Sequence, residues 1–118
     1  MTINSKFKYL GVGEAQYVGI PHDYVLFTEE HQLLKKDTWD KFIEVFTENS
    51  DDHDKGWRCE FWGKMMRGAC LTYRYHGNEE LYAVLEYAVK ELLKVQRADG
   101  RFSTYSEEVQ FNGWDLWG

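Results

Sequence analysis

The sequence is poor in the residues that usually punctuate or crosslink a chain. Its 118 residues include one proline, Pro21, and two cysteines, Cys59 and Cys70. The cysteines lie within one expected helix, about 16 Å apart along its axis, which is beyond the reach of a disulfide. We therefore expect reduced, buried thiols, as is typical of a cytoplasmic protein.

Long apolar runs are also missing. Residues 1–8 carry a little positive charge with no apolar stretch behind them, so we expect no secretory signal. No segment approaches the roughly 20 apolar residues that a membrane-spanning helix needs. These absences predict a cytoplasmic protein without a membrane partner.

Positive charge is scarce, whereas aromatic side chains are abundant. Lys and Arg number 14 against 20 Asp and Glu, which gives a net charge of −6. This excess of negative charge disfavours binding to a phosphate backbone, so nucleic acid is not an expected partner. The aromatic fraction of 17% argues against a disordered chain, and the length fits one domain.

The first 37 residues show no helical period. Gly11, Gly13 and Gly19 are interspersed with apolar residues, and residues 24–27 form a short apolar run. We interpret residues 1–37 as an irregular or extended segment with at most one short strand. The Gly-x-Gly pair lacks the third glycine and the strand–helix context of a dinucleotide site, so it predicts only a glycine-rich loop.

Residues 38–118 are expected to form the helical part of the chain. The first helix should begin at Thr38, be capped by Asp37 and end near Thr47. The polar stretch that follows contains His53 and several carboxylates. It lacks the glycine and terminal glutamate of a calcium loop, so we interpret it as a solvated loop and expect no metal.

Two further helices should form an antiparallel αα-hairpin. The helix over residues 57–76 is apolar or small on most sides, which predicts burial on most sides. Its glycines, Gly63 and Gly68, each cost about 1 kcal/mol relative to alanine, and close approach of neighbouring helices would offset that cost. The next helix is capped by Asn78, and the short link forces the two to pack together as an inner and an outer helix. Its one apolar stripe consists of Leu81, Leu85, Ala88, Leu92 and Val95.

The sequence stops within an aromatic cluster. Residues 97–101 predict a turn and residues 102–106 a short extended segment. Trp114 and Trp117 then lie in what resembles the first turn of another helix, and they would leave a large apolar surface uncovered. We therefore expect the chain to be part of a longer protein, with uncovered helical surface as a route to self-association.

Several segments between residues 56 and 118 resemble the N-terminal part of glycoside hydrolase family 127, the β-L-arabinofuranosidase group, and its uncharacterised bacterial relatives. The resemblance implies a mainly α fold, in which αα-hairpins belong to an (α/α)6 barrel, a six-hairpin toroid that is incomplete in this chain. The segments are Trp57-Arg58-Cys59-Glu60-Phe61-Trp62-Gly63-Lys64, the hairpin to Glu91, Gln96 through Thr104-Tyr105, and Gly113-Trp114-Asp115-Leu116-Trp117-Gly118.

The resemblance places the chemistry outside this chain. Characterised members of the family use a glutamate acid/base and a zinc-held cysteine nucleophile, both further along the barrel. Neither Cys59 nor Cys70 has a second cysteine nearby, and no Glu-x-Cys pattern occurs. We therefore assign no catalytic residue, and we expect no cofactor and no metal here.

Candidate sugar contacts follow from the same resemblance, because the inner helices of such a barrel present their N-terminal ends to the central cleft. An aromatic face can stack on a sugar ring, and a carboxylate can accept hydrogen bonds from its hydroxyls. Trp62 and Trp117 are expected to lie in the core instead. Two of the candidates, Arg58 and Glu60, could equally form an ion pair. Glu60 and Asp115 are the one acid pair that would merit a test as glycosidase carboxylates. The candidates are Trp57, Arg58, Glu60, Thr104, Tyr105, Trp114 and Asp115.

Three functions remain open at this point. The leading hypothesis is the N-terminal portion of a bacterial glycoside hydrolase that acts on arabinofuranoside-like or other plant-type sugars and supplies part of the cleft. The alternative is a stand-alone helical module that binds carbohydrate or protein without catalysis. The third is a helical repeat with only a structural role.

Overall fold

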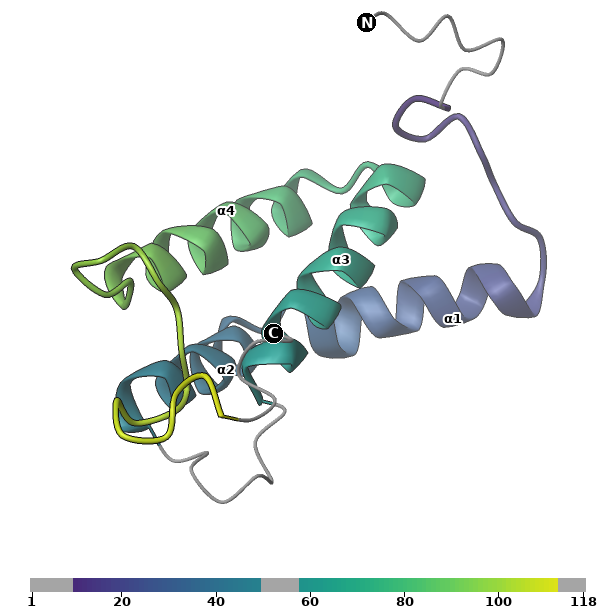
Figure 1. The fold of residues 1–118 in the computed structure, drawn as a ribbon. Coiled ribbons are helices and arrows are strands. Elements are labelled where there is room, and N and C mark those ends of the chain that lie inside the picture. Colours follow the sequence, from purple (N-terminus) through teal and green to yellow (C-terminus); the bar gives the residue numbers. More distant parts are fainter. Residues whose placement is uncertain (1–9, 50–57, 113–118) are drawn as a thin grey trace, which may run out of the picture.

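The chain is mainly helical in the computed structural model, which describes residues 10–49 and 58–112 (Figure 1). This confirms the expected fold class, and no strand occurs in these two ranges. Residues 102–106, expected to be extended, are irregular. The elements in chain order are α1 (Ile20–Thr28), the π-helix η1 (Glu29–Leu33), α2 (Lys36–Glu48), α3 (Arg58–His76) and α4 (Glu79–Lys94).

The helical stretch over residues 20–33 corrects the expectation of irregular or extended structure before residue 38. Gly19 turns the chain into α1 with a φ of 70°, and Pro21 lies in the first turn, where a missing N–H costs no helical hydrogen bond. No residue of α1 is buried, so no apolar stripe marks this helix in the sequence. The proposed division at residue 37 stays a prediction, with a helical element now in its first part.

Helix α2 supplies much of the core. It begins at Lys36 after Lys35, so Asp37 lies in the first turn near the positive helix end and does not cap the helix as expected. Trp39 is fully buried, its Nε1 donates to Leu33 O at 2.9 Å, and its ring meets Trp62 edge to face at 6.2 Å. The core cluster comprises Leu33, Trp39, Ala69, Leu81, Val84, Leu85 and Ala88.

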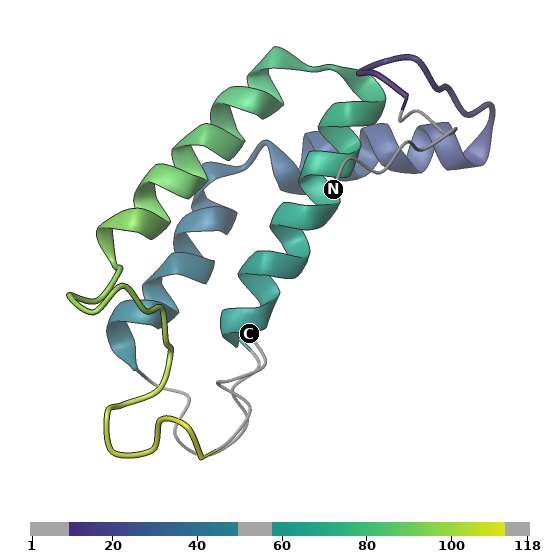
Figure 2. The ribbon, with the colours of Figure 1, turned by 45° about the horizontal axis from the view of Figure 1, so that its top comes forward.

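Helices α3 and α4 form the expected hairpin (Figure 2). Asn78 caps α4 by accepting a hydrogen bond from Glu80 N at 2.9 Å, as its position predicts. On the outer side, Lys90 Nζ lies 3.1 Å from Glu86 Oε1, one helical turn away. The predicted stripe of α4 is confirmed, since Leu81, Leu85 and Ala88 are buried and Leu92 and Val95 are half-buried.

The expectation that α3 is buried on most sides is wrong for this chain. Among its described side chains, from residue 59 to 76, only Ala69 is buried. A Cβ added at Gly63 or Gly68 would meet no atom within 4 Å. Cys59 is half-buried and Cys70 exposed, so the expected burial of both thiols is also wrong. Both predictions fail for the same reason: the described helices pack against one side of α3 and leave its other side open.

Alanine at Gly63 or Gly68 should therefore stabilise the chain. Each position lies in a helix with open space around it, so replacement should raise the free energy of unfolding by about 1 kcal/mol. Urea denaturation followed by circular dichroism measures the change. Gly77→Ala serves as the control and should destabilise, because Gly77 has a φ of 73° and an added Cβ would lie 3.2 Å from Val12. A loss of stability in Gly63→Ala or Gly68→Ala would contradict the open space around that position.

The helices separate two ends of the molecule (Figures 1 and 2). At one end, which we call the loop end, the C-terminal part of α2 lies beside the chain that follows α4, as the edge-to-face rings of Phe46 and Phe102 show at 6.3 Å. The turn between α3 and α4 lies at the opposite end, where residues 10–17 contact α3. None of the helices in the described part of the chain is long and apolar enough to span a bilayer.

Candidate functional site

A cavity of about 780 Å³ opens at the loop end. Its walls combine the last turn of α2, the residues directly after α4 and part of the loop that follows. Its lining surface is mostly apolar but includes hydroxyl, amide, guanidinium and carboxylate groups, a combination that can accommodate both the apolar face and the hydroxyls of a sugar. The lining residues are Phe46, Thr47, Asn49, Arg97, Ala98, Asp99, Ser106 and Glu107.

Arg97 connects the walls of this cavity. Its Nη2 donates to Asn49 Oδ1 and to the carbonyl oxygen of Tyr105, both at 2.9 Å. Its Nη1 lies 3.6 Å from Glu107 Oε1, a carboxylate that is almost fully exposed. The Arg97 side chain itself is only 20% exposed. The guanidinium is therefore held by neutral oxygens from two separate segments of the chain.

A second arginine, Arg101, stabilises the loop after α4 through contacts with other residues of the same loop. Arg101 pairs with Asp99 at 2.6 Å, and the hydrogen bond from Arg101 lowers the pKa of Asp99 below its ordinary value. Arg101 Nη1 also donates to Gln110 Oε1 at 2.8 Å. Gln110 is buried, and its Nε2 donates to Tyr105 O at 3.1 Å. The loop is thus a hydrogen-bonded unit with the Tyr105 carbonyl at its centre.

The structure changes the interpretation of Thr104 and Tyr105, two of the candidate sugar contacts. Their exposed fractions are 0% and 2%, so neither side chain can touch a ligand in this arrangement. They lie in the interior of the loop, between the turn at 97–101 and Gln110. We therefore treat both as residues that shape the loop.

The other candidates are divided between described and undescribed residues. Glu60 is half-buried near the start of α3 and pairs with Lys64 at 2.5 Å. Arg58 begins α3, but its side chain lies outside the description, as do Trp57, Trp114 and Asp115. The proposed acid pair of Glu60 and Asp115 therefore has only one described member.

The prediction that Trp62 packs in the core is confirmed. Its ring packs against the core cluster and meets Trp39 edge to face. Trp117, for which we also expect a core role, lies outside the described residues. Across the described ranges, no group of three or more His, Cys, Asp or Glu side chains is arranged to hold a metal ion.

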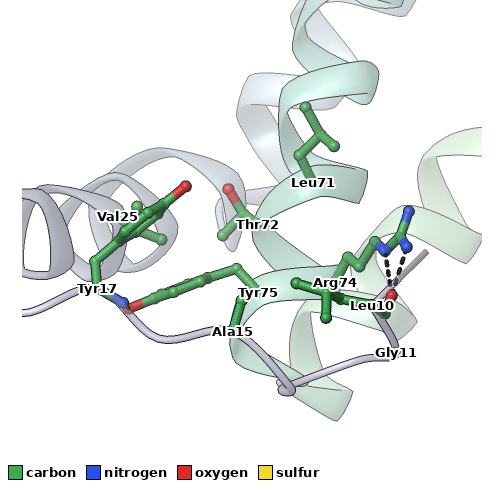
Figure 3. Close-up of a pocket in the computed structure, with 9 residues that line it drawn as sticks. All are labelled: Leu10, Gly11, Ala15, Tyr17, Val25, Leu71, Thr72, Arg74 and Tyr75. Carbon is green, nitrogen blue, oxygen red and sulfur yellow. Dashed lines mark hydrogen bonds between the residues drawn. The ribbon is translucent and has the colours of Figure 1, made fainter. Parts of the chain in front are cut away.

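A second cavity, of about 610 Å³, lies at the opposite end and was not foreseen from the sequence (Figure 3). Tyr17 and Tyr75 stack there with ring centroids 5.1 Å apart. The Tyr75 hydroxyl accepts a hydrogen bond from Tyr17 N at 3.0 Å and lies 2.7 Å from His22 Nδ1. Arg74 donates to the carbonyl of Leu10, as the dashed lines in Figure 3 show. These polar groups bind protein atoms, as Arg97 and Asn49 do at the loop end.

Comparison with known proteins supplies a family. The model of the family described as β-L-arabinofuranosidase, GH127 catalytic domain, matches residues 16–118. The match extends well upstream of residue 56, where the resemblance in the sequence begins. Neither the curated proteins nor the solved structures give a match. The chain belongs to this family of glycoside hydrolases.

Proposed function

We propose that this chain, as a member of glycoside hydrolase family 127, supplies part of the carbohydrate cleft of an α/α-barrel catalytic domain, without the full catalytic machinery. The family match over residues 16–118 is the observation that carries this proposal. The helical hairpin and the cavity at the loop end support it, because the N-terminal end of α3 lies at that end (Figure 2).

The ligand that we propose is an arabinofuranoside-like or other plant-type sugar. Sugar hydroxyls need paired donors and acceptors, and the cavity lining offers exposed hydroxyl and carboxylate groups at Thr47, Asp99 and Glu107. Aromatic rings would stack on the apolar face of the sugar, a role that we assign to Trp57 and Trp114. Arg58, Glu60 and Asp115 complete the proposed contacts as hydrogen-bonding groups.

The uncovered side of α3 supports a larger assembly around this chain. Leu71 is 59% exposed, and Gly63 and Gly68 have open space where a Cβ would lie, which leaves room for close helix packing. We propose that further hairpins of the barrel cover this surface in the intact protein. The location that we propose is the cytoplasm, because Cys59 and Cys70, both among the described residues, form no disulfide.

Titration of the chain with methyl β-L-arabinofuranoside tests the proposal. We expect a saturable change in tryptophan fluorescence, because indoles at the cleft change environment when a sugar stacks on them. Trp57→Ala and Trp114→Ala should each weaken binding by about tenfold, which corresponds to roughly 1.4 kcal/mol. Trp62→Phe is the control: it alters a core indole and should lower stability but not affinity. An unchanged signal over the whole titration would contradict the proposal.

The alternative is a stand-alone helical module that binds carbohydrate or protein without catalysis. The exposed apolar side chains of α4 favour it, since Tyr82 and Leu93 are 51% and 54% exposed beside the half-buried Met66 of α3. Native mass spectrometry distinguishes the stand-alone module from the part of a larger barrel. A stable monomer that binds sugar would support the stand-alone module. Self-association through this surface would support the proposal that other parts of the barrel cover it in the intact protein.

A further inference from the structure

We infer that Arg97 is a positioning residue: it fixes the end of α2 against the loop after α4, and so sets the spacing between the walls of the cavity at the loop end. The inference rests on the proposed function for its ligand, but not for its geometry.

The first contact of Arg97 is with the end of α2. Asn49 follows this helix in a left-handed conformation, with φ and ψ of 48° and 47°. Its Nδ2 is 3.2 Å from the carbonyl oxygen of Thr47, which leaves Oδ1 directed to the Arg97 guanidinium. Thr47 and Asn49 both line the cavity, so Arg97 holds this part of its wall through Asn49.

The second contact is with the loop after α4, whose Ser106 and Glu107 also line the cavity. The carbonyl oxygen of Tyr105 accepts from Arg97 Nη2 and from Gln110 Nε2, so it is the shared acceptor of this loop. The Arg97 backbone closes the turn from the other side, because its N–H donates to Arg101 O at 2.9 Å and its carbonyl accepts from Gly100 N at 2.8 Å. The side chain and the backbone of Arg97 are thus both hydrogen-bonded to this loop.

The chemistry of the side chain explains why this position suits arginine. One terminal nitrogen, Nη2, carries two hydrogens at a fixed angle in the guanidinium plane, and each serves one of two oxygens on different segments. Lysine has the same charge, but it is a point charge on a flexible stem and lacks this planar geometry. Charge alone should therefore not reproduce the connection. This difference allows the positioning role to be separated from electrostatic stabilisation.

The test compares Arg97→Lys and Arg97→Ala with Arg67→Lys, an exposed arginine on α3. Hydrogen–deuterium exchange needs no ligand: Arg97→Lys should speed exchange around Asn49 and around Tyr105 together, while α4 keeps its protection. Fluorescence titration with methyl β-L-arabinofuranoside should then show about tenfold weaker binding for Arg97→Lys, with a melting temperature close to that of the unchanged chain. Arg97→Ala should show both effects and a lower melting temperature, and Arg67→Lys neither.

The outcomes separate this inference from the proposed function. If the unchanged chain binds no sugar, the proposed function fails, and the exchange data alone decide the role of Arg97. Faster exchange at only one of the two segments, or at neither, would overturn the inference. So would an Arg97→Lys variant that binds sugar as tightly as the unchanged chain, since charge would then be sufficient.

Discussion

Replacing Trp39 with alanine should cost about 3–5 kcal/mol of the free energy of unfolding, enough to unfold much of a chain of this size. The indole is fully buried, joins α2 to Trp62 of α3 and donates a hydrogen bond to Leu33 O at 2.9 Å. Its removal would leave a cavity and an unpaired carbonyl at the place where three elements meet. Urea denaturation at 25 °C, followed by far-ultraviolet circular dichroism, measures the loss.

Phe27→Ala provides the matched control for Trp39→Ala. Phe27 is also aromatic, but it is 59% exposed and lies on α1, which has no buried residue. Its replacement should change the free energy of unfolding by less than about 0.5 kcal/mol. If Trp39→Ala costs as little as Phe27→Ala, the described core does not stabilise the chain.

Glu29→Ala should cost about 2 kcal/mol, because it removes the acceptor at a buried junction. The residue is 3% exposed in the π-helix η1. Its carboxylate lies 3.0 Å from His76 Nδ1 at the end of α3 and accepts from the side-chain amide of Asn78, the cap of α4. Alanine would leave the Asn78 amide without this acceptor and would loosen the contact between η1 and the hairpin.

Thermal unfolding of Glu29→Ala and Glu29→Gln at pH 7 measures this contribution. Glutamine keeps the volume and one carbonyl acceptor, so it should cost less than alanine. Glu30→Ala is the control, because Glu30 is the next residue in the chain and its carboxylate is exposed. Equal melting temperatures for Glu29→Ala and Glu30→Ala would show that the junction carries no stability.

The elements that the sequence predicts well are those determined by local signals. The αα-hairpin follows from the four- and three-residue spacing in α4, the cap at Asn78 and the short link after Gly77. Helix α1 carries no such signal, because none of its residues is buried and its apolar run over 24–27 reads equally as a strand. The start of α2 was missed by two residues because Asp37 suits the first helical turn as well as a cap.

Burial and the site depend on contacts between distant residues, and these were harder to predict. The exposure of Cys70 is set by which helices cover α3, which no local pattern records. The hydrogen bond between Arg97 and Asn49 spans 48 positions in the sequence. Thr104 and Tyr105 were proposed as sugar contacts from their place in a motif, and only the folded loop shows them buried. Trp57, Arg58, Glu60, Trp114 and Asp115 remain predictions that require a ligand to test.

Chemical-shift mapping tests the central claim, sugar recognition at the loop end, most directly. The amide spectrum of the chain would be recorded during titration with methyl β-L-arabinofuranoside. We predict that the shifts concentrate on Asn49, Arg97 and Ser106 and increase to saturation. Shifts that concentrate instead around Tyr17 and Tyr75 at the opposite end, or a spectrum that does not change, would contradict the account.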